Sequence, residues 1–231
     1  KNFVNGNNII FHYVRLPKNT GSSGGFYEGV KRAYEKGYDW LWLTDDDGIP
    51  FNNCLENQIP DSIDVISGPI VIDDKNRETW DYSHFSEKGG RWYTKIYELF
   101  KIPYKTIPFN GFLVSREVVE KIGFPKSEFF IQCDDVEYSW RAIKNGYKLR
   151  IYKNAKFFHP RAISHKPENV SEKTLYYYVR NNLIIARNYD FLLIRTMKRL
   201  IDMLLLAFKV NRNKKRIIFK AILDGLLIKT R

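Results

Sequence analysis

The chain has 231 residues, a formal net charge of +12, a hydrophobic content of 44% and an aromatic content of 16%, which argue against disorder and allow one sizeable core with an appendage. Its two cysteines, Cys54 and Cys133, are far apart and form no CxxC pair, which argues against a disulfide framework or a zinc knuckle and favours a reducing compartment. No signal peptide is visible, and no apolar run reaches the roughly 18 residues that a membrane span needs.

The first forty residues predict a strand, a glycine-rich turn and a helix. Residues 9–14 are apolar and aromatic, as in a strand, and residues 19–25 are small and polar. The helix that follows ends before Gly37, and its apolar residues have helical spacing: Phe26, Val30, Ala33 and Tyr34. A glycine-rich turn at a helix amino terminus presents free N–H groups that suit a phosphate. The same glycines would equally allow close packing of the helix on a sheet.

An acidic turn follows the next predicted strand. Residues 40–43 form a short apolar run, and Asp45, Asp46 and Asp47 come directly after it, before Gly48. This order predicts carboxylates at the carboxyl end of a sheet strand, where open α/β sheets bind ligands. Three adjacent carboxylates repel one another unless a cation or a ligand's donors neutralise them, and oxygen ligands favour Mg²⁺ or Mn²⁺. A solvated acidic turn is the alternative.

The middle of the chain predicts further strands and short helices. We expect a short helix around residues 51–57, strands at 64–72 and 110–115, and a helix at 116–122 that Ser115 caps. Residues 73–108 carry many aromatic side chains and predict an irregular hairpin. Their rings could stack on sugars or form a hydrophobic cluster under a long loop.

A second acidic group opens a helix that is predicted to run from residue 134 to about 144. The helix dipole explains one carboxylate in the first turn but does not require three. Asp134 or Asp135 is therefore a candidate general base, whereas Glu137 is placed to pair with Arg141 one turn later. After a further strand at 148–152, His159 precedes a proline and is either a core histidine or a cation ligand.

The carboxyl-terminal part is helical and strongly basic. A long helix is predicted from Ser171 to about Tyr189. Residues 191–231 hold eleven Lys or Arg and two acids, which gives +9 of the total charge, and they predict two amphipathic helices. Such helices lie well on an anionic membrane, and the alternative is packing on the rest of the chain or on a second subunit. Nucleic acid is not expected as a partner because no reading motif accompanies the charge.

Taken together, these motifs resemble the family 2 inverting glycosyltransferases of GT-A fold, and among them the bacterial galactofuranosyltransferases and rhamnosyltransferases. The resemblance covers roughly residues 9–190. It rests on an ordered set of residues: Asn19 with Gly24 and Gly25, residues 42–47, residues 110–112, residues 134–138 with Arg141, His159, and Tyr177 with Arg180 and Asn181.

The resemblance implies roles for the first group of residues. Asp45 and Asp47 resemble the family's DxD pair, which holds a divalent cation, Mn²⁺ or Mg²⁺, and the nucleotide-sugar diphosphate. His159 resembles the histidine that completes the metal site. Asn19, Gly24, Asp45 and Asp46 are the expected contacts of the nucleotide sugar.

The resemblance also implies the chemistry of the second group. Asp135 resembles the catalytic base and Asp134 its acidic neighbour near the acceptor. The expected activity is metal-dependent, inverting transfer of galactofuranose or rhamnose from a UDP- or dTDP-linked donor to a cell-surface glycan or a lipid-linked acceptor. The expected location is cytoplasmic, at the inner face of the cell membrane. An inactive, truncated remnant, or a carbohydrate-binding module that uses the aromatic residues of 80–97, is the alternative.

The expected fold is an α/β, Rossmann-like GT-A sheet of mixed direction, flanked by helices. The family's domain begins with a strand and a helix that carry most contacts to the nucleotide base, and the resemblance implies that this chain starts after them. Residues 1–190 are expected to form the GT-A domain without that unit, and residues 191–231 a basic amphipathic helical appendage. A homo-oligomer remains open as one explanation of the appendage.

Overall fold

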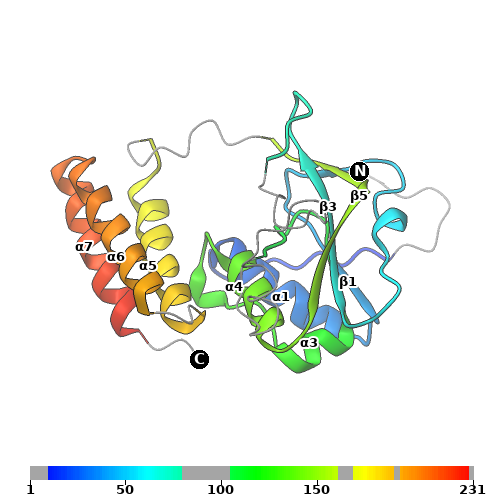
Figure 1. Ribbon diagram of the computed structural model, residues 1–231. Coiled ribbons are helices and arrows are strands. Elements are labelled where there is room, and N and C mark those ends of the chain that lie inside the picture. Colours follow the sequence, from blue (N-terminus) through cyan, green and yellow to red (C-terminus); the bar gives the residue numbers. More distant parts are fainter. Residues whose placement is uncertain (1–9, 80–104, 161–168, 190–192, 229–231) are drawn as a thin grey trace.

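The computed structural model describes residues 10–79, 105–160, 169–189 and 193–228. It consists of a sheet, helices that lie beside the sheet, and a bundle of helices from the carboxyl-terminal part (Figure 1). Helices α1 (Gly21–Glu35) and α4 (Asp134–Lys144) lie between the sheet and the bundle. The chain is therefore layered, with the two acidic motifs on the sheet and on an adjoining helix.

The five described strands form one mixed sheet in the order β1 (Trp40–Leu43), β4 (Phe112–Ser115), β3 (Val65–Ile72), β5 (Lys148–Phe158) and β2 (Ile49–Pro50). Strand β3 is central and buried at every position, as its continuous apolar sequence predicts. Its pairing with β5 is parallel, and the register shifts after Pro69, which has no N–H to donate. The remaining pairs are antiparallel.

The strand directions place three strand ends at one edge of the sheet. Strands β1 and β3 are both antiparallel to β4, so they run in the same direction, and β5 is parallel to β3. The segments that follow Leu43, Ile72 and Phe158 therefore leave the sheet at the same edge. Strand β2 then pairs with the last residues of β5, with Ile49 opposite Phe158. Because β2 follows the acidic turn directly, this pairing places the turn close to the end of β5.

The helices beside the sheet begin and end at the predicted signals. The Ser115 hydroxyl accepts from Val118 N at the start of α3 (Arg116–Ile122), and the helix ends at Gly123, whose φ is +79°. Helix α1 directs Val30 into the core that it shares with the sheet and α3. Two short 3₁₀ helices complete this part, η1 (Glu56–Gln58) and η3 (Ser127–Phe129).

Two predicted elements differ from the structure. Residues 10–14 form no strand, because they run beside α1, where no strand offers backbone partners, and Phe11 and Tyr13 are exposed. The helix expected at residues 51–57 is a set of turns that ends in η1, since Asn53 has a φ of +58° and interrupts helical geometry. The strand expected at 148–152 is present but continues to Phe158.

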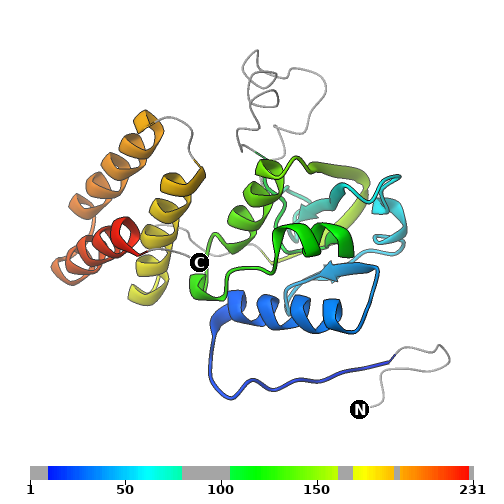
Figure 2. The ribbon, with the colours of Figure 1, turned by 90° about the horizontal axis from the view of Figure 1, so that it is seen from below.

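Helices α5 (Glu172–Tyr189), α6 (Leu193–Phe208) and α7 (Arg212–Leu227) form the bundle, which stands apart from the sheet in Figure 2. They share one core that includes Leu183, Met203 and Ile218. Gly225 allows α7 to approach α5 closely, because a Cβ there would lie 2.8 Å from the Arg180 carbonyl oxygen. The two predicted amphipathic helices are thus present and pack on α5. None of the described helices combines the length and apolarity that crossing a bilayer requires.

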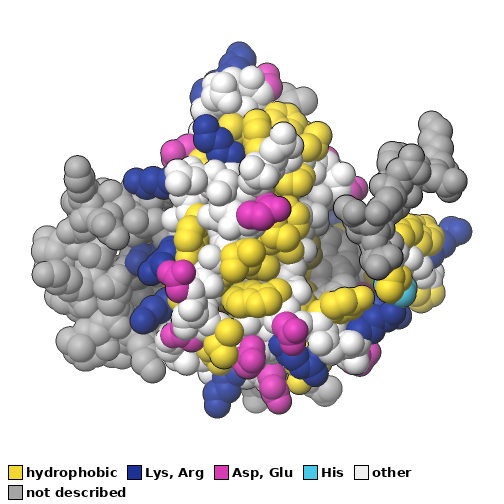
Figure 3. All heavy atoms as spheres, turned by 90° about the vertical axis from the view of Figure 1, so that its right-hand side faces the viewer, with side chains coloured by type: hydrophobic (Ala, Val, Ile, Leu, Met, Phe, Trp, Pro, Cys, Tyr) yellow, Lys and Arg dark blue, Asp and Glu magenta, His cyan; other side chains and the backbone are white. Residues whose placement is uncertain are grey.

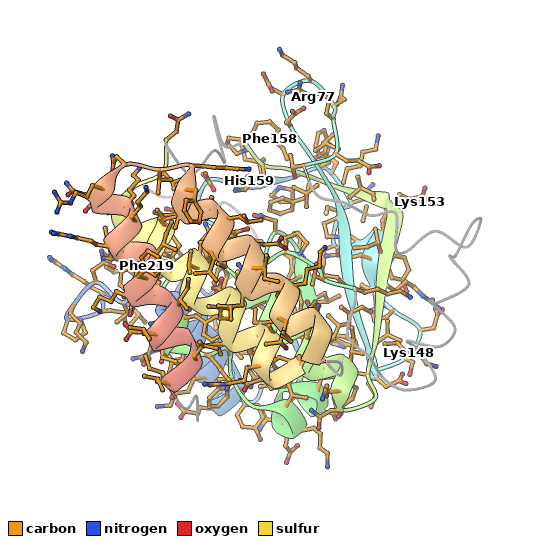
Figure 4. All side chains as sticks on the ribbon, turned by 60° about the vertical axis from the view of Figure 1, so that its left-hand side comes forward. Arg77, Lys148, Lys153, Phe158, His159 and Phe219 are labelled. Atoms are coloured by element: carbon orange, nitrogen blue, oxygen red, sulfur yellow. The ribbon has the colours of Figure 1, made fainter. Side chains whose placement is uncertain are left out.

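On the side of the sheet turned away from the bundle, the segment that includes η1 packs on the strands, with Cys54 and Gln58 buried (Figure 1). Figure 3 views this side and shows apolar side chains near its middle with charged ones around them. Figure 4 labels both ends of β5, with Lys148 at one end and Phe158 and His159 at the other. His159 therefore lies at the same edge of the sheet as the acidic turn.

Candidate active site

The acidic turn and His159 meet at the carboxyl edge of the sheet. His159 Nε2 lies 3.1 Å from Asp47 Oδ1 and 3.8 Å from Asp45 Oδ2. The backbone N–H of His159 donates to the Ile72 carbonyl, which fixes the histidine at the end of β5 (Figure 4). Gly48 is needed in the turn, because a Cβ there would lie 2.4 Å from the Phe157 ring. Asp45 and Asp47 thus share one site with His159, which lies more than one hundred positions further along the chain.

These three side chains form a donor set that fits a divalent cation. One ligand atom from each of Asp45, Asp47 and His159 lies within 4.8 Å of the others, so a single ion could contact all three. Two carboxylates and an imidazole suit Mn²⁺ better than Mg²⁺, which prefers oxygen ligands alone. Asp73 also lies at this edge, but its carboxylate accepts from the backbone N–H groups of its own turn and from Arg77.

The electrostatics of the site favour a positive charge. Burial raises the pKa of Asp45 to about 6, and the charges of Asp47 and Asp134 add to the rise, whereas His159 and a hydrogen bond from the Asn110 side chain oppose it. About a third of the Asp45 side chain is exposed, and more than half of Asp47. The site is therefore open to solvent on the Asp47 side and costly for an unpaired carboxylate on the Asp45 side.

A cavity of about 720 Å³ connects the start of α1 with the acidic turn. Ser22 and Gly25 line it on the helix side, and Asp45 and Asp46 line it at the turn. Of the predicted loop residues, Asn19 lies outside this lining, and its side chain accepts from Gly21 N at 2.9 Å. Gly24 is buried, and a Cβ there would lie 2.3 Å from the Thr20 side chain. The structure thus brings Asp46 to the cavity wall, whereas Asn19 precedes α1 and Gly24 lies in the first turn of that helix, both outside the lining.

The second pair of acids lies in the first turn of α4. Asp134 is buried and Asp135 is half-buried. Burial raises the pKa of both carboxyls. The negative charges of Asp134 and Asp45 raise the pKa of Asp135 further, and the charge of Asp134 also raises the pKa of Asp45. The two acidic motifs are therefore electrostatically coupled, although they come from different parts of the sequence.

The third acid of α4 has a structural partner. Glu137 is buried, its Oε2 accepts from Arg141 at 2.7 Å, and its Oε1 accepts from the Tyr189 hydroxyl at 2.5 Å. Arg141 also donates to the carbonyls of Ile122 and Phe124. The predicted pairing of Glu137 with Arg141 is thus present, and it leaves Asp134 and Asp135 as the acids of α4 whose charges are coupled to Asp45.

Sequence reasoning overlooked one residue of the site and proposed others that cannot be compared with the structure. Asn110 was quoted only as part of a motif, yet its side chain lies beside Asp45. Its place in the Asn110-Gly111 turn that leads into β4 is the only local signal, and the pairing of β4 with β1 is what brings it to the acidic turn. The aromatic residues of 80–97 lie outside the described residues.

This mixed α/β sheet, with an acidic turn at its carboxyl edge and helices against it, is the architecture of a GT-A glycosyltransferase. The model of glycosyl transferase family 2 matches residues 1–123, more than half of the chain. The chain belongs to this family. The matched span includes the glycine-rich turn and the acidic turn, and it ends before Asp134.

The chain is also similar to several characterised proteins. It is 30% identical to galactofuranosyltransferase GlfT1 of Mycobacterium tuberculosis over 176 residues, which are 69% of this chain and 55% of that protein. It is 27% identical to GlfT1 of Mycolicibacterium smegmatis over 69% of this chain and 57% of that protein. It is 26% identical to dTDP-rhamnosyl transferase RfbF of Shigella flexneri over 93% of this chain and 78% of that protein. The chain thus spans little more than half the length of the mycobacterial relatives.

Proposed function

We propose that the chain transfers a sugar, galactofuranose or rhamnose, from a UDP- or dTDP-linked donor to a glycan acceptor with inversion at the anomeric carbon. The observation that carries this proposal is the convergence of Asp45, Asp47 and His159 beside the cavity that α1 and β1 enclose. Family membership and the names of the relatives support the transfer of a sugar. The donor and the acceptor are part of the proposal.

The cavity supplies a place for the donor. Asp45, Asp47 and His159 would hold a divalent cation, which when bound neutralises the diphosphate of the donor and of the departing nucleotide. Asp46, at the cavity wall, is placed to accept hydrogen bonds from the donor. Asn19 and Gly24 shape the start of α1, Asn19 by accepting from Gly21 N and Gly24 by leaving room for the Thr20 side chain. The start of α1 adds backbone N–H groups near Ser22.

Asp135 is the proposed base. Its carboxylate takes the proton of an acceptor hydroxyl while that oxygen forms a bond to the anomeric carbon. The bond between this carbon and the diphosphate oxygen breaks, and its electron pair leaves with the nucleotide. Burial, and after it the charge of Asp134, raises the pKa of Asp135, which makes its ionised carboxylate a stronger proton acceptor.

Calorimetric titration of UDP and dTDP tests the donor site. We expect binding that requires Mn²⁺ in the wild-type protein and is lost in Asp47→Ala. Asp61→Ala removes an acid whose side chain is almost fully exposed on another part of the surface, and it is the control that should bind as the wild type does. Equal binding with and without Mn²⁺, or undiminished binding to Asp47→Ala, would contradict the proposed site.

We also propose that α6 and α7 rest on an anionic membrane, which would place the enzyme at the inner, cytoplasmic face of the cell membrane with access to a lipid-linked acceptor. On α6 the exposed apolar side chains recur at helical spacing: Met197, Ile201, Leu205 and Phe208. On α7, Phe219 (labelled in Figure 4), Leu223 and Leu227 are exposed in the same way. Basic residues accompany both stripes, and Lys215 lies over the Phe208 ring. An apolar stripe with basic neighbours is complementary to an anionic bilayer surface.

Sedimentation with lipid vesicles tests this surface. We expect binding to phosphatidylcholine vesicles that contain about one-third phosphatidylglycerol, and little binding to phosphatidylcholine alone. Ile201→Gln with Leu205→Gln should weaken binding about tenfold, since each side chain loses apolar area that would enter the bilayer. Ile63→Gln, an equally exposed isoleucine of the sheet body, is the control. A concentration-dependent dimer that the double variant abolishes, without vesicle binding, would indicate a second subunit instead.

A further inference from the structure

The segment that leads into the two acids of α4 has an unfavourable backbone. Three of its residues, Phe130, Gln132 and Cys133, have φ of +63°, +72° and +67°. Residues other than glycine rarely adopt this left-handed conformation, and it persists only where the surroundings hold it. Cys133 is also the residue directly before α4, so the path of residues 128–133 sets where Asp134 and Asp135 begin the helix. We call these residues the left-handed segment.

Asn181 holds this segment from α5. Its side chain is fully buried, and its amide nitrogen donates to three carbonyls of the segment, those of Phe129 at 3.0 Å, Ile131 at 3.0 Å and Gln132 at 2.7 Å. In an extended strand or a helix, three carbonyls within four residues do not point at one atom. Their convergence on a single amide therefore depends on the left-handed residues and in turn stabilises them.

Arg180 fixes the orientation of the Asn181 amide. Its Nε and Nη2 donate to Asn181 Oδ1 at 2.9 and 2.7 Å, which leaves the amide nitrogen directed at the segment. Nη2 also donates to the Glu128 carbonyl at 2.5 Å. The guanidinium lies 4.6 Å from the centre of the Tyr177 ring, which stacks on Phe130. One turn of α5 thus contacts the left-handed segment from Glu128 to Gln132.

The opposite side of the segment touches the start of α1. Ser23 N donates to the Phe130 carbonyl at 3.1 Å. A Cβ on Gly21 would lie 1.9 Å from the same carbonyl oxygen, and Gly21 has a φ of +71°, so only glycine fits there. The left-handed segment therefore lies between α5 and the helix start that borders the donor cavity. A shift of the segment would move the acids relative to that cavity.

We propose that Asn181 is a positioning residue for sugar transfer: by holding three carbonyls of the left-handed segment, it sets the place of Asp135 and Asp134 against the donor cavity. This inference rests on the proposed function and assigns a role to the Tyr177, Arg180 and Asn181 motif, which the donor site and the base leave unexplained. Asn181 acts through the backbone and does not touch the reacting groups. Because α5 belongs to the bundle, the bundle helps to hold the two acids of α4 in place.

Asn181→Asp is the decisive variant. It keeps the shape and the oxygen that Arg180 contacts, but it replaces the donor by an acceptor that faces three carbonyls. Because a displacement of about 1 Å of a catalytic group costs roughly 100-fold in rate, we expect kcat to fall about 100-fold. The KM of the donor and the Mn²⁺-dependent affinity for UDP should stay within about twofold, since the cation site is on another part of the chain. Asn181→Ser, which keeps one donor, should give an intermediate kcat.

Arg187→Gln is the matched control on the same helix. Arg187 donates to the carbonyls of Leu226 and Ile228 at the end of α7 and does not contact the left-handed segment. Its loss removes hydrogen bonds of the same kind, so kcat should remain within about twofold of the wild type. A 100-fold loss in Arg187→Gln would show that any weakening of the bundle lowers the rate, and the assignment of Asn181 would be overturned.

Hydrogen exchange tests the same inference without turnover. A peptide that covers residues 127–137 should exchange about tenfold faster in Asn181→Asp than in the wild type, while a peptide from β3 is unchanged. If the wild type transfers no sugar, the proposed function fails, and the exchange measurement still decides the role of Asn181. Unchanged exchange at 127–137 in Asn181→Asp would overturn the proposal, and so would a kcat within about threefold of the wild type. A joint change of kcat, UDP affinity and β3 exchange would also overturn it, because it would indicate a general loss of structure.

Discussion

Replacement of Asp45 by asparagine should stabilise the cation-free protein while it removes the response to Mn²⁺. Burial and neighbouring charges raise the Asp45 pKa from its ordinary value of 3.8 to about 6, so the ionised carboxylate opposes folding at neutral pH. This difference in pKa corresponds to roughly 3 kcal/mol in the free energy of unfolding. Because about a third of the side chain is exposed and solvent screens part of its charge, we expect about 1–2 kcal/mol.

The pH dependence of this stability difference follows from the direction of the pKa shift. A raised pKa in the folded state means that the folded protein holds this proton more tightly than the unfolded chain. The contribution of Asp45 to stability is therefore fully present below pH 3.8 and is lost as the pH rises through about 6. Asp45→Asn should thus exceed the wild type in stability at about pH 7.5, and the advantage should vanish at about pH 4.

Thermal unfolding in the presence of a chelator, and then of Mn²⁺, measures both effects. For a chain of this size 1–2 kcal/mol corresponds to a rise in Tm of about 2–4 °C in chelator. The wild type should gain about 2.7 kcal/mol, or about 5 °C, at Mn²⁺ concentrations near 100 times Kd, and Asp45→Asn far less. Asp61→Asn, which neutralises an exposed acid, should change neither value. A lower Tm of Asp45→Asn in chelator, or an equal gain with Mn²⁺, would refute the electrostatic argument.

Three further predictions concern the base, the acidic turn and the buried ion pair. Asp135→Asn should lower kcat by a factor of about 10²–10⁴ and leave UDP affinity within about twofold; steady-state kinetics with unchanged turnover would reject Asp135 as the base. Gly48→Ala should weaken Mn²⁺ binding about tenfold, as measured by calorimetry, because its methyl group would lie 2.4 Å from Phe157 and displace the turn. Arg141→Met should lower the free energy of unfolding, measured in urea, by about 3–5 kcal/mol, since it leaves the buried Glu137 carboxylate without its cation. Adding Glu137→Gln should recover part of this loss, and no recovery would mean that the Arg141 bonds to Ile122 and Phe124 dominate.

The roles of the predicted site residues differ in how directly the sequence suggested them. Asp45 and Asp47 were found from a local pattern, an apolar run followed by acids and a glycine. His159 was found as a candidate but had no partner in its own neighbourhood of the sequence. Asn110 and Asn181 gave weaker signals, because an asparagine before a strand or inside a helix has many structural uses.

The element types were largely determined by the sequence alone. The apolar run of β3, the Ser115 cap of α3 and the amphipathic pattern of α6 are local features, since hydrogen bonds within a helix or the alternation along a strand depend on neighbours in the chain. The family motifs could be recognised in the same way. Residues 10–14 are the counterexample, because a strand also needs a partner that local sequence does not specify.

The tertiary structure decided how the motifs meet. The antiparallel pairing of β2 with the end of β5 brings the acidic turn to His159, and no pattern within either segment specifies that pairing. The hold of Asn181 on the left-handed segment likewise spans some fifty positions of the chain. Strand order and helix docking depend on contacts that become favourable only when the whole core is packed, so the sequence by itself determined which residues carry the chemistry, and the fold determined which of them share a site.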